Sequence, residues 1–143
     1  MADVGDIRVN IFMDRGSYSK DHTQISINIR IINVGSSPVL IEKNMIMGYN
    51  LIISLTSPSN KTLSSRQHDP RPSSPAIIYR ELDEEYHGRF NLKDLRWNSD
   101  PWGRSGEFLI QAEYIVHWFD RTGPYNVMRE NRFPSNIIPF NII

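Results

Sequence analysis

Glu107–Trp118, with the sequence Glu-Phe-Leu-Ile-Gln-Ala-Glu-Tyr-Ile-Val-His-Trp, is the stretch that decides the fold class of this chain. Its even-numbered positions are all apolar or aromatic: Phe108, Ile110, Ala112, Tyr114, Val116 and Trp118. Its polar residues stand at odd-numbered positions: Glu107, Gln111, Glu113 and His117. Alternation with a period of two predicts a β-strand with one apolar face. That face must pack against a second layer, so we expect an all-β protein with sheet packed on sheet.

Length and charge narrow the possibilities further. The 143 residues fit one domain, 1–143, which is long enough to bury a core. Sixteen lysines and arginines balance sixteen acidic residues, and this zero net charge gives no reason to expect nucleic acid or an anionic membrane as a partner. The chain has no cysteine, which excludes disulfides, thiolate metal sites and a cysteine nucleophile.

The amino terminus carries no targeting signal in the sequence as written. Met-Ala-Asp-Val-Gly-Asp has neither a basic segment nor an apolar run, and no stretch approaches the length of a membrane span. The sequence therefore predicts a soluble, cytoplasmic protein. A module cut from a longer secreted protein would look the same, so the localisation stays open.

About seven to nine short strands are expected, separated by turn-forming residues. The clearest of the others carries Ile25, Ile27, Ile29 and Ile31 on one face, and the last carries Ile138, Phe140 and Ile142. Pro139 lacks an amide hydrogen, so the last strand should be an edge or pair on one side only at that point. One helical turn is predicted at 91–95, capped by Asn91. This pattern favours an antiparallel β-sandwich.

The segment 57–75 is rich in serine and proline and poor in apolar residues. Such a composition cannot offset the entropy of ordering by burying surface, so we expect a long exposed loop. Long loops in compact domains are usually functional or disordered. The candidate partner-binding residues on this loop are Arg66, His68, Asp69 and Arg71.

Trp97 and Trp102 are the other candidates for partner binding. They flank the turn-rich sequence Asn98-Ser99-Asp100-Pro101 and could offer aromatic faces to a ligand. The alternative interpretation is that they plug one end of the sandwich, since tryptophan is mostly buried.

No pattern of catalytic or metal-binding residues is found. The four histidines are scattered, without the spacing that brings zinc ligands together. The acidic group around Glu84 lacks the spacing of a calcium loop. There is no nucleophile elbow, phosphate-binding glycine loop or dinucleotide fingerprint. We therefore expect no enzymatic activity, no cofactor and no metal.

Several short motifs resemble bacterial immunoglobulin-like sandwich modules. They are Asn33-Val34-Gly35 closing an early strand, Phe90-Asn91-Leu92 before the short turn, Gly106-Glu107-Phe108 opening the long strand, and Ser135-Asn136 before the last one. The resemblance covers roughly residues 20–143 and implies an immunoglobulin-like scaffold and not a site. The strand order also bears a looser likeness to small intracellular serine-proteinase inhibitors of bacilli, with no reactive-site motif matched.

The sequence favours a non-enzymatic binding or structural module that contacts another protein and is a monomer or weak dimer. One alternative is a proteinase inhibitor that presents the 57–75 loop, with Arg66 or Arg71 offered to the enzyme. Another is a module from a larger cell-surface or assembly protein.

Overall fold

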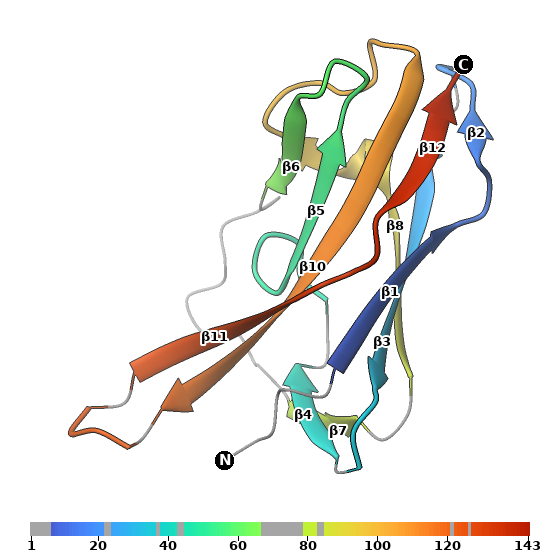
Figure 1. Cartoon of the computed structure of the whole chain (residues 1–143). Helices are drawn as coiled ribbons and strands as arrows, with labels where there is room; N and C mark the ends of the chain where they lie inside the picture. The colour runs from blue at the N-terminus through green and yellow to red at the C-terminus, as the bar shows by residue number, and fades with distance from the viewer. Residues whose placement is uncertain are drawn as a thin grey trace.

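The computed structural model of the protein describes residues 7–21, 24–36, 38–42, 45–66, 79–82, 85–120, 122–125 and 127–143. These residues form twelve strands and one short 3-10 helix, so the predicted all-β class is confirmed (Figure 1). The elements in chain order are β1 (Ile7–Met13), β2 (Ser17–Tyr18), β3 (Ser26–Asn33), β4 (Val39–Glu42), β5 (Leu51–Thr56), β6 (Thr62–Arg66), β7 (Tyr79–Leu82), β8 (Tyr86–Asn91), η1 (Leu92–Asp94), β9 (Arg96–Trp97), β10 (Gly106–Asp120), β11 (Val127–Pro134) and β12 (Ile138–Ile142).

The number of strands exceeds the predicted seven to nine. Two of the additional strands, β2 and β9, are only two residues long, which is too short for an alternating pattern to be visible. The predicted helical turn is confirmed, because Asn91 caps η1 by accepting a hydrogen bond from the Lys93 amide at 3.2 Å.

Three antiparallel strands form the smaller sheet, called sheet A, in the order β1-β3-β8. Ile29 of β3 lies opposite Ile11 of β1 and Gly88 of β8. The four isoleucines of this region, Ile25, Ile27, Ile29 and Ile31, are fully buried. Because strand residues alternate between faces, the residues between these isoleucines point to the outer face of sheet A.

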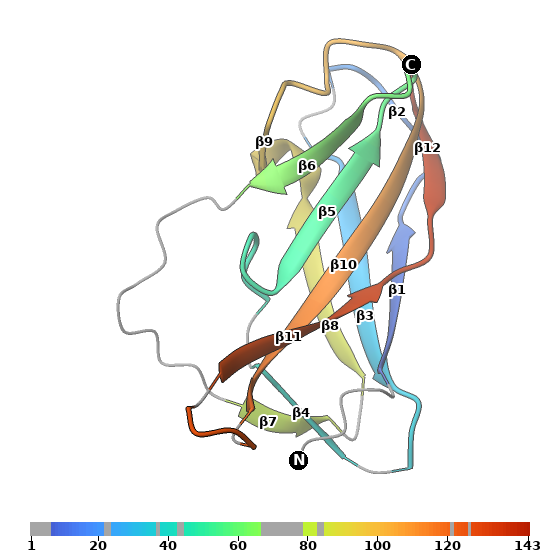
Figure 2. The ribbon, with the colours of Figure 1, turned by 60° about the vertical axis from the view of Figure 1, so that its left-hand side comes forward.

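The larger sheet, sheet B, is organised around β10 and curls along its length (Figures 1 and 2). Its strand order is β2-β12-β10-β5-β6-β9, and β11 pairs with the second half of β10. One edge of β10 pairs with β5, while the other pairs first with β12 and then with β11. The pairing of β2 with β12 is parallel, so the sheet is not antiparallel throughout as predicted.

The core lies between the two sheets and contains the predicted apolar face of β10. Phe108, Ile110, Ala112, Tyr114 and Val116 are at most 3% exposed, so this part of the alternation is confirmed. The side chain of Trp118 lies outside the described part of the structure.

Ile115 is also buried, although its odd position predicts an outward side chain. The reason is the turn before β5. The amide of Ile115 donates to the Asn50 carbonyl at 2.8 Å, and the buried Tyr49 stacks on His117 with ring centroids 4.4 Å apart. The turn therefore covers the second face of β10 at this level.

The segment between β11 and β12 connects the two sheets. Ser135 exchanges hydrogen bonds with Ala112 of β10: its amide donates to the Ala112 carbonyl at 2.8 Å, and its hydroxyl accepts from the Ala112 amide at 2.9 Å. The side chain of Asn136 accepts from the Ile11 amide at 2.8 Å and donates to the Ile11 carbonyl at 3.1 Å. The Asn136 amide group thus pairs with the outer edge of β1 as a neighbouring strand would.

The prediction that 57–75 is one long exposed loop is wrong for residues 62–66, which form β6. Leu63 and Ser65 are buried, and β6 pairs with β5 on one side and β9 on the other. The Ser65 hydroxyl accepts from the Ile53 amide at 3.0 Å and donates to the sulfur of Met47 at 3.1 Å. A serine whose hydroxyl is hydrogen-bonded in this way can be buried at little cost, which a composition argument does not anticipate.

The second half of β10 and β11 form a two-stranded ribbon that projects beyond the sheets at the lower left of Figures 1 and 2. Arg132 of β11 forms a cross-strand ion pair with Glu113 of β10 at 2.8 Å and a second ion pair with Glu130 of its own strand at 2.9 Å. The hydrogen bonds that Arg132 donates to Glu130 and, next in size, to Glu113 raise the pKa of Arg132 above its ordinary value. At the tip of the ribbon, Tyr125 is 80% exposed.

None of the described residues belongs to a helix long and apolar enough to cross a membrane.

Candidate partner-binding surface

The outer face of sheet A combines arginines, amides and one exposed aromatic ring. Its three strands contain no acidic residue and three arginines, Arg8, Arg30 and Arg89. Among the described residues that flank these strands, the acidic ones are Asp14 and Glu85. Because the core side of the sheet is apolar, these charges gather on one surface.

Ion pairs fix several of these side chains in place. Glu85 pairs with Arg30 and lies 3.3 Å from His87. At the other end of the same face, Arg89 pairs with Asp14 at 2.7 Å. Among the described residues of this face and its flanks, with Arg15 included, four arginines stand against two carboxylates, 4 − 2 = +2 with histidine neutral.

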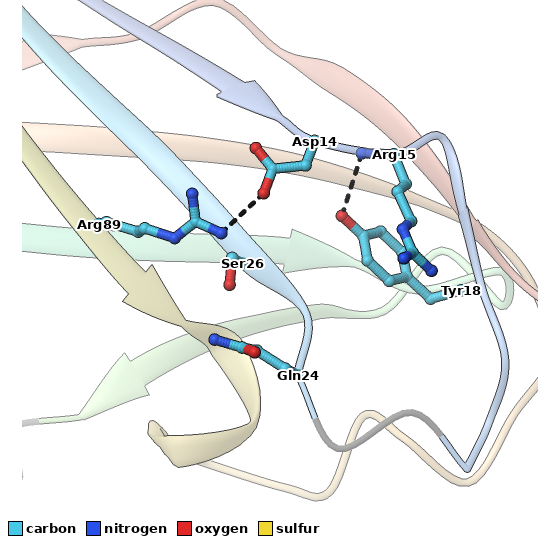
Figure 3. Close-up of a pocket in the computed structure, with 6 residues that line it drawn as sticks. All are labelled: Asp14, Arg15, Tyr18, Gln24, Ser26 and Arg89. Carbon is cyan, nitrogen blue, oxygen red and sulfur yellow. Dashed lines mark hydrogen bonds and ion pairs between the residues drawn. The ribbon is translucent and has the colours of Figure 1, made fainter.

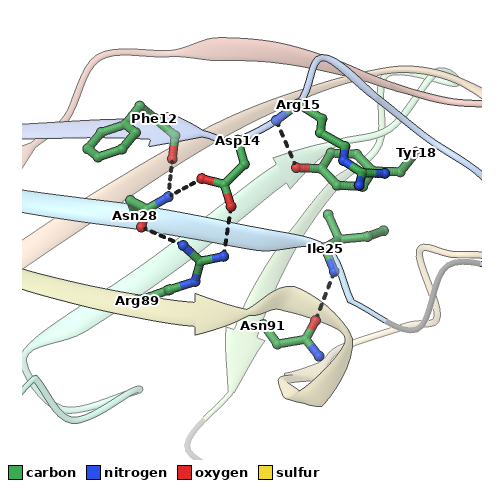
Figure 4. A network of polar contacts seen from close by, with 8 residues as sticks. All are labelled: Phe12, Asp14, Arg15, Tyr18, Ile25, Asn28, Arg89 and Asn91. Atoms are coloured by element: carbon green, nitrogen blue, oxygen red, sulfur yellow. Dashed lines mark hydrogen bonds and ion pairs between the residues drawn. The ribbon is translucent and has the colours of Figure 1, made fainter.

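Asp14, Asn28 and Arg89 form a closed network across the three strands (Figure 4). The Asn28 amide donates to the Asp14 carboxylate at 3.1 Å and to the Phe12 carbonyl at 3.5 Å. Arg89 donates through Nη1 to the Asn28 oxygen at 3.3 Å and through Nη2 to Asp14 at 2.7 Å. Each polar side chain is held by two others, so the network is ordered before any partner arrives.

Phe12 lies beside this network and is 49% exposed. It stands directly opposite Asn28 in the β1–β3 register, and Asn28 stands opposite Arg89 in the β3–β8 register. An aromatic ring, an amide and a guanidinium therefore follow one another across the sheet. Aromatic residues and arginine are the residues most enriched at protein interfaces.

A pocket of about 180 Å³ adjoins this surface where the segment after β1 arches over β3 (Figure 3). Ser26 belongs to the outer face by its position in β3, is only 5% exposed and lines this pocket. The Tyr18 hydroxyl accepts a bond from the Arg15 amide at 3.3 Å, which holds the arch closed on itself. The six residues that line the pocket are Asp14, Arg15, Tyr18, Gln24, Ser26 and Arg89.

Trp97 and Trp102 meet at the end of the core, edge to face, with ring centroids 6.3 Å apart. Both are partly buried and pack against the core cluster, and Trp102 also contacts Phe108 at a centroid distance of 6.3 Å. Trp97 donates its indole hydrogen to the Leu92 carbonyl at 3.0 Å. The two rings also line a surface pocket of about 290 Å³, with Lys93 6.0 Å from the Trp102 ring. The pair thus closes this end of the core and still presents a surface.

Of the candidate residues on the 57–75 loop, only the backbone of Arg66 belongs to the described part of the structure. Arg66 was expected on an exposed loop, but its backbone ends β6 and pairs with Arg96 of β9. Its side chain is outside the described part of the structure, as are the residues His68, Asp69 and Arg71.

Within the described ranges, two histidines each lie near a single glutamate. His117 lies 3.7 Å from Glu130 on the ribbon, and His87 lies beside Glu85 on sheet A. In these ranges no group of three or more metal-ligating side chains lies close enough together to hold a metal ion.

Sequence reasoning did not identify Phe12, Asp14, Asn28 and Arg89 as a site. Alternation alone indicates that Phe12 and Asn28 face away from the core, but not that β8 lies beside β3. Asp14 and Arg89 are 75 residues apart in the chain, so only the pairing of the strands brings them together. No protein-family model, curated protein or solved structure matches this chain.

Proposed function

We propose that this chain is a non-enzymatic binding module with an immunoglobulin-like β-sandwich fold, and that the outer face of sheet A contacts an acidic partner protein. The observation that carries the proposal is the ordered Asp14–Asn28–Arg89 network beside the half-exposed ring of Phe12.

The strand order supports the immunoglobulin-like part of the proposal. In immunoglobulin domains, strands A, B and E form one sheet and strands G, F and C face them. Here β1-β3-β8 faces β12-β10-β5, and β6 continues that sheet as an additional strand next to C. One difference concerns strand D, which in constant-type domains pairs with E, whereas β7 pairs with β4 in a separate two-stranded sheet.

The ordered side chains and the arginines of this face support the proposal that it binds a partner. A partner that docks on side chains already held in place loses less conformational entropy than one that must order them. The excess of arginine among the described residues of this face favours acidic partners, because complementary charge speeds association and disfavours wrong partners. Phe12 can supply apolar contact area at the centre of such an interface.

Photo-cross-linking in cells of the source organism tests the proposal. Phe12 is replaced by p-benzoylphenylalanine, and Leu109, 39% exposed on the outer side of β10, serves as the matched position on the opposite sheet. We expect discrete adducts from position 12 that fall when Arg89 is replaced by glutamine, and none of the same adducts from position 109. Identical adducts from both positions, or none from position 12, would contradict the proposal.

A further inference from the structure

We infer that the pocket formed by Trp97 and Trp102 at the end of the core binds a neutral sugar, a pyranose ring whose substituents are equatorial. The pocket has a volume of about 290 Å³ and lies where β9 pairs with β6 (Figure 2). Its lining residues belong to η1, β9 and the segments beside them, and none lies on a strand of sheet A. The inference is therefore independent of the proposed function.

The two tryptophan rings form a corner. Their planes are 85° apart and their centroids 6.3 Å apart, so one ring presents its edge to the face of the other. A pyranose with equatorial substituents has two flat faces of C–H bonds, and its hydroxyl groups lie around the rim. A face of that kind can lie on one indole ring while the rim of the sugar meets the polar groups beside it.

Both rings are held in place before a ligand arrives. Trp97 donates its indole hydrogen to the Leu92 carbonyl at 3.0 Å, and Trp102 packs against the core cluster. The turn between them is fixed to β6, because the Ser64 amide donates to the Asn98 side chain at 3.2 Å. A ligand that binds side chains already in position loses less conformational entropy than one that must order them.

Two side chains of opposite charge border the rings. Lys93 and Asp100 line the same pocket, and their charges cancel, 1 − 1 = 0. The Lys93 ammonium donates to the Lys20 carbonyl at 3.1 Å, which leaves it further N–H donors. One oxygen of Asp100 accepts from the Trp102 amide at 3.0 Å, and the carboxylate has further lone pairs. The pocket thus offers both donors and acceptors, as a ligand rich in hydroxyl groups requires.

These charges disfavour other classes of ligand. The Lys93 ammonium lies 6.0 Å from the centroid of the Trp102 ring, where it repels a quaternary ammonium ligand. Because Asp100 offsets Lys93, the pocket gives phosphate and carboxylate ligands no net attraction. Proline-rich peptides also dock on aromatic grooves, but a proline has no amide hydrogen to donate to the carboxylate. A neutral sugar satisfies both the rings and the charged groups.

Titration of the isotope-labelled full chain, followed by NMR, tests this inference. The probes are the neutral trisaccharides cellotriose and chitotriose, each at up to about 10 mM, which covers dissociation constants near 1 mM. The comparison ligands are mannitol, whose hydroxyl groups lie on an open chain, and the blocked peptide acetyl-hexaproline-amide. We expect at least one trisaccharide to shift the indole N–H signals of Trp97 and Trp102, and the comparison ligands to shift neither.

Two substitutions locate the effect, and a third is their control. Trp102→Leu keeps an apolar side chain against Phe108 but removes the aromatic face, and should weaken trisaccharide binding by about tenfold or more. Asp100→Asn keeps an oxygen for the Trp102 amide and should weaken binding by about fivefold or more, because a charged acceptor forms stronger bonds than a neutral one. Asp94→Asn removes the same charge from an exposed position outside the pocket and should leave the affinity unchanged.

The absence of a shift with both trisaccharides, equal affinity for mannitol or hexaproline, or an equal effect of Asp100→Asn and Asp94→Asn would overturn the inference. If Trp102→Leu lost the spectrum of a folded chain, the comparison of the two aspartate variants would decide. The cross-linking experiment at Phe12 can still identify a partner in each of these cases, so failure here is distinguishable from failure of the proposed function.

Discussion

Ile110 lies at the point where both neighbouring strands pair with β10. It stands opposite Leu55 of β5 and Ile138 of β12 and is fully buried. Ile110→Ala should lower the free energy of unfolding by about 2–5 kcal/mol, through lost burial and the cavity that remains. Chemical denaturation measures this change.

Glu113 provides the matched comparison three residues further along β10. Its side chain is 33% exposed, and its ion pair with Arg132 is a surface one, worth about 1 kcal/mol or less. Glu113→Ala should therefore change the stability by no more than that. If Glu113→Ala proved the more damaging of the two, our assignment of the buried face of β10 would be inverted.

Asn136 holds the edge of β1 through its side-chain amide, next to the backbone bridge between Val9 and Ser135. Asn136→Ala leaves the amide and carbonyl of Ile11 without their partner, which should cost about 1–3 kcal/mol. Hydrogen exchange of the Ile11 amide should accelerate at the same time. Ile137→Ala, at a position that is 59% exposed, should stay within about 0.5 kcal/mol of the original protein. Unchanged exchange at Ile11 would show that Asn136 does not protect this edge.

Gly106 begins β10 with a backbone that few other residues would accept. Its φ is +130°, and a Cβ atom at this position would lie 2.8 Å from the side chain of Pro58. The Gly106-Glu107-Phe108 motif noticed in the sequence thus has a steric reason, because the β5–β6 turn packs directly on the start of the long strand.

At the scale of single elements, strands with an apolar face were predictable and polar ones were not. The alternation in β3, β5 and β10 follows directly from their packing on one core. β6 has one large apolar residue, Leu63, and its other buried residue is Ser65. Since a hydrogen-bonded serine replaces an apolar residue there, no pattern of hydrophobicity marks the strand.

β6 yields a direct test of this explanation. Ser65→Ala should lower stability by about 1–3 kcal/mol, because the buried Ile53 amide loses its acceptor. Ser64→Ala, at a partly exposed position of the same strand, should cost less than about 0.5 kcal/mol. Thermal or denaturant unfolding compares the two, and equal effects would indicate that β6 is not held by the Ser65 hydroxyl.

The candidate site on the outer face of sheet A could likewise be predicted only in part from the sequence. Which residues of β1 and β3 point outward follows from their alternation, and the positive charge of the strands can be counted. The network additionally requires that β8 pair with β3 so that Arg89 reaches Asp14. Long-range strand pairing leaves no local signal, so the site could not be assembled from the sequence.

At the scale of the whole molecule, the last strand, β12, affects whether two copies of the chain can associate. Pro139 pairs with Leu109 of β10, and on the opposite side β2 reaches only Asn141 and Ile142. Proline without an amide hydrogen discourages a further strand from pairing at this position. We therefore expect a monomer or a weak dimer. Light scattering over a concentration series measures this, and a dimer that persists on dilution would contradict it.

The bond between Asn136 and Ile11 also has a consequence for synthesis on the ribosome. Its two residues are 125 positions apart in the chain. At roughly 5–20 residues per second, the edge of β1 waits about 6–25 s for its partner to be translated. An open strand edge is a template for pairing with other chains during that interval. Arg8 and Asn10 place polar side chains on the strand while its edge is exposed, and a nascent chain is most vulnerable to misassembly before residue 136 emerges.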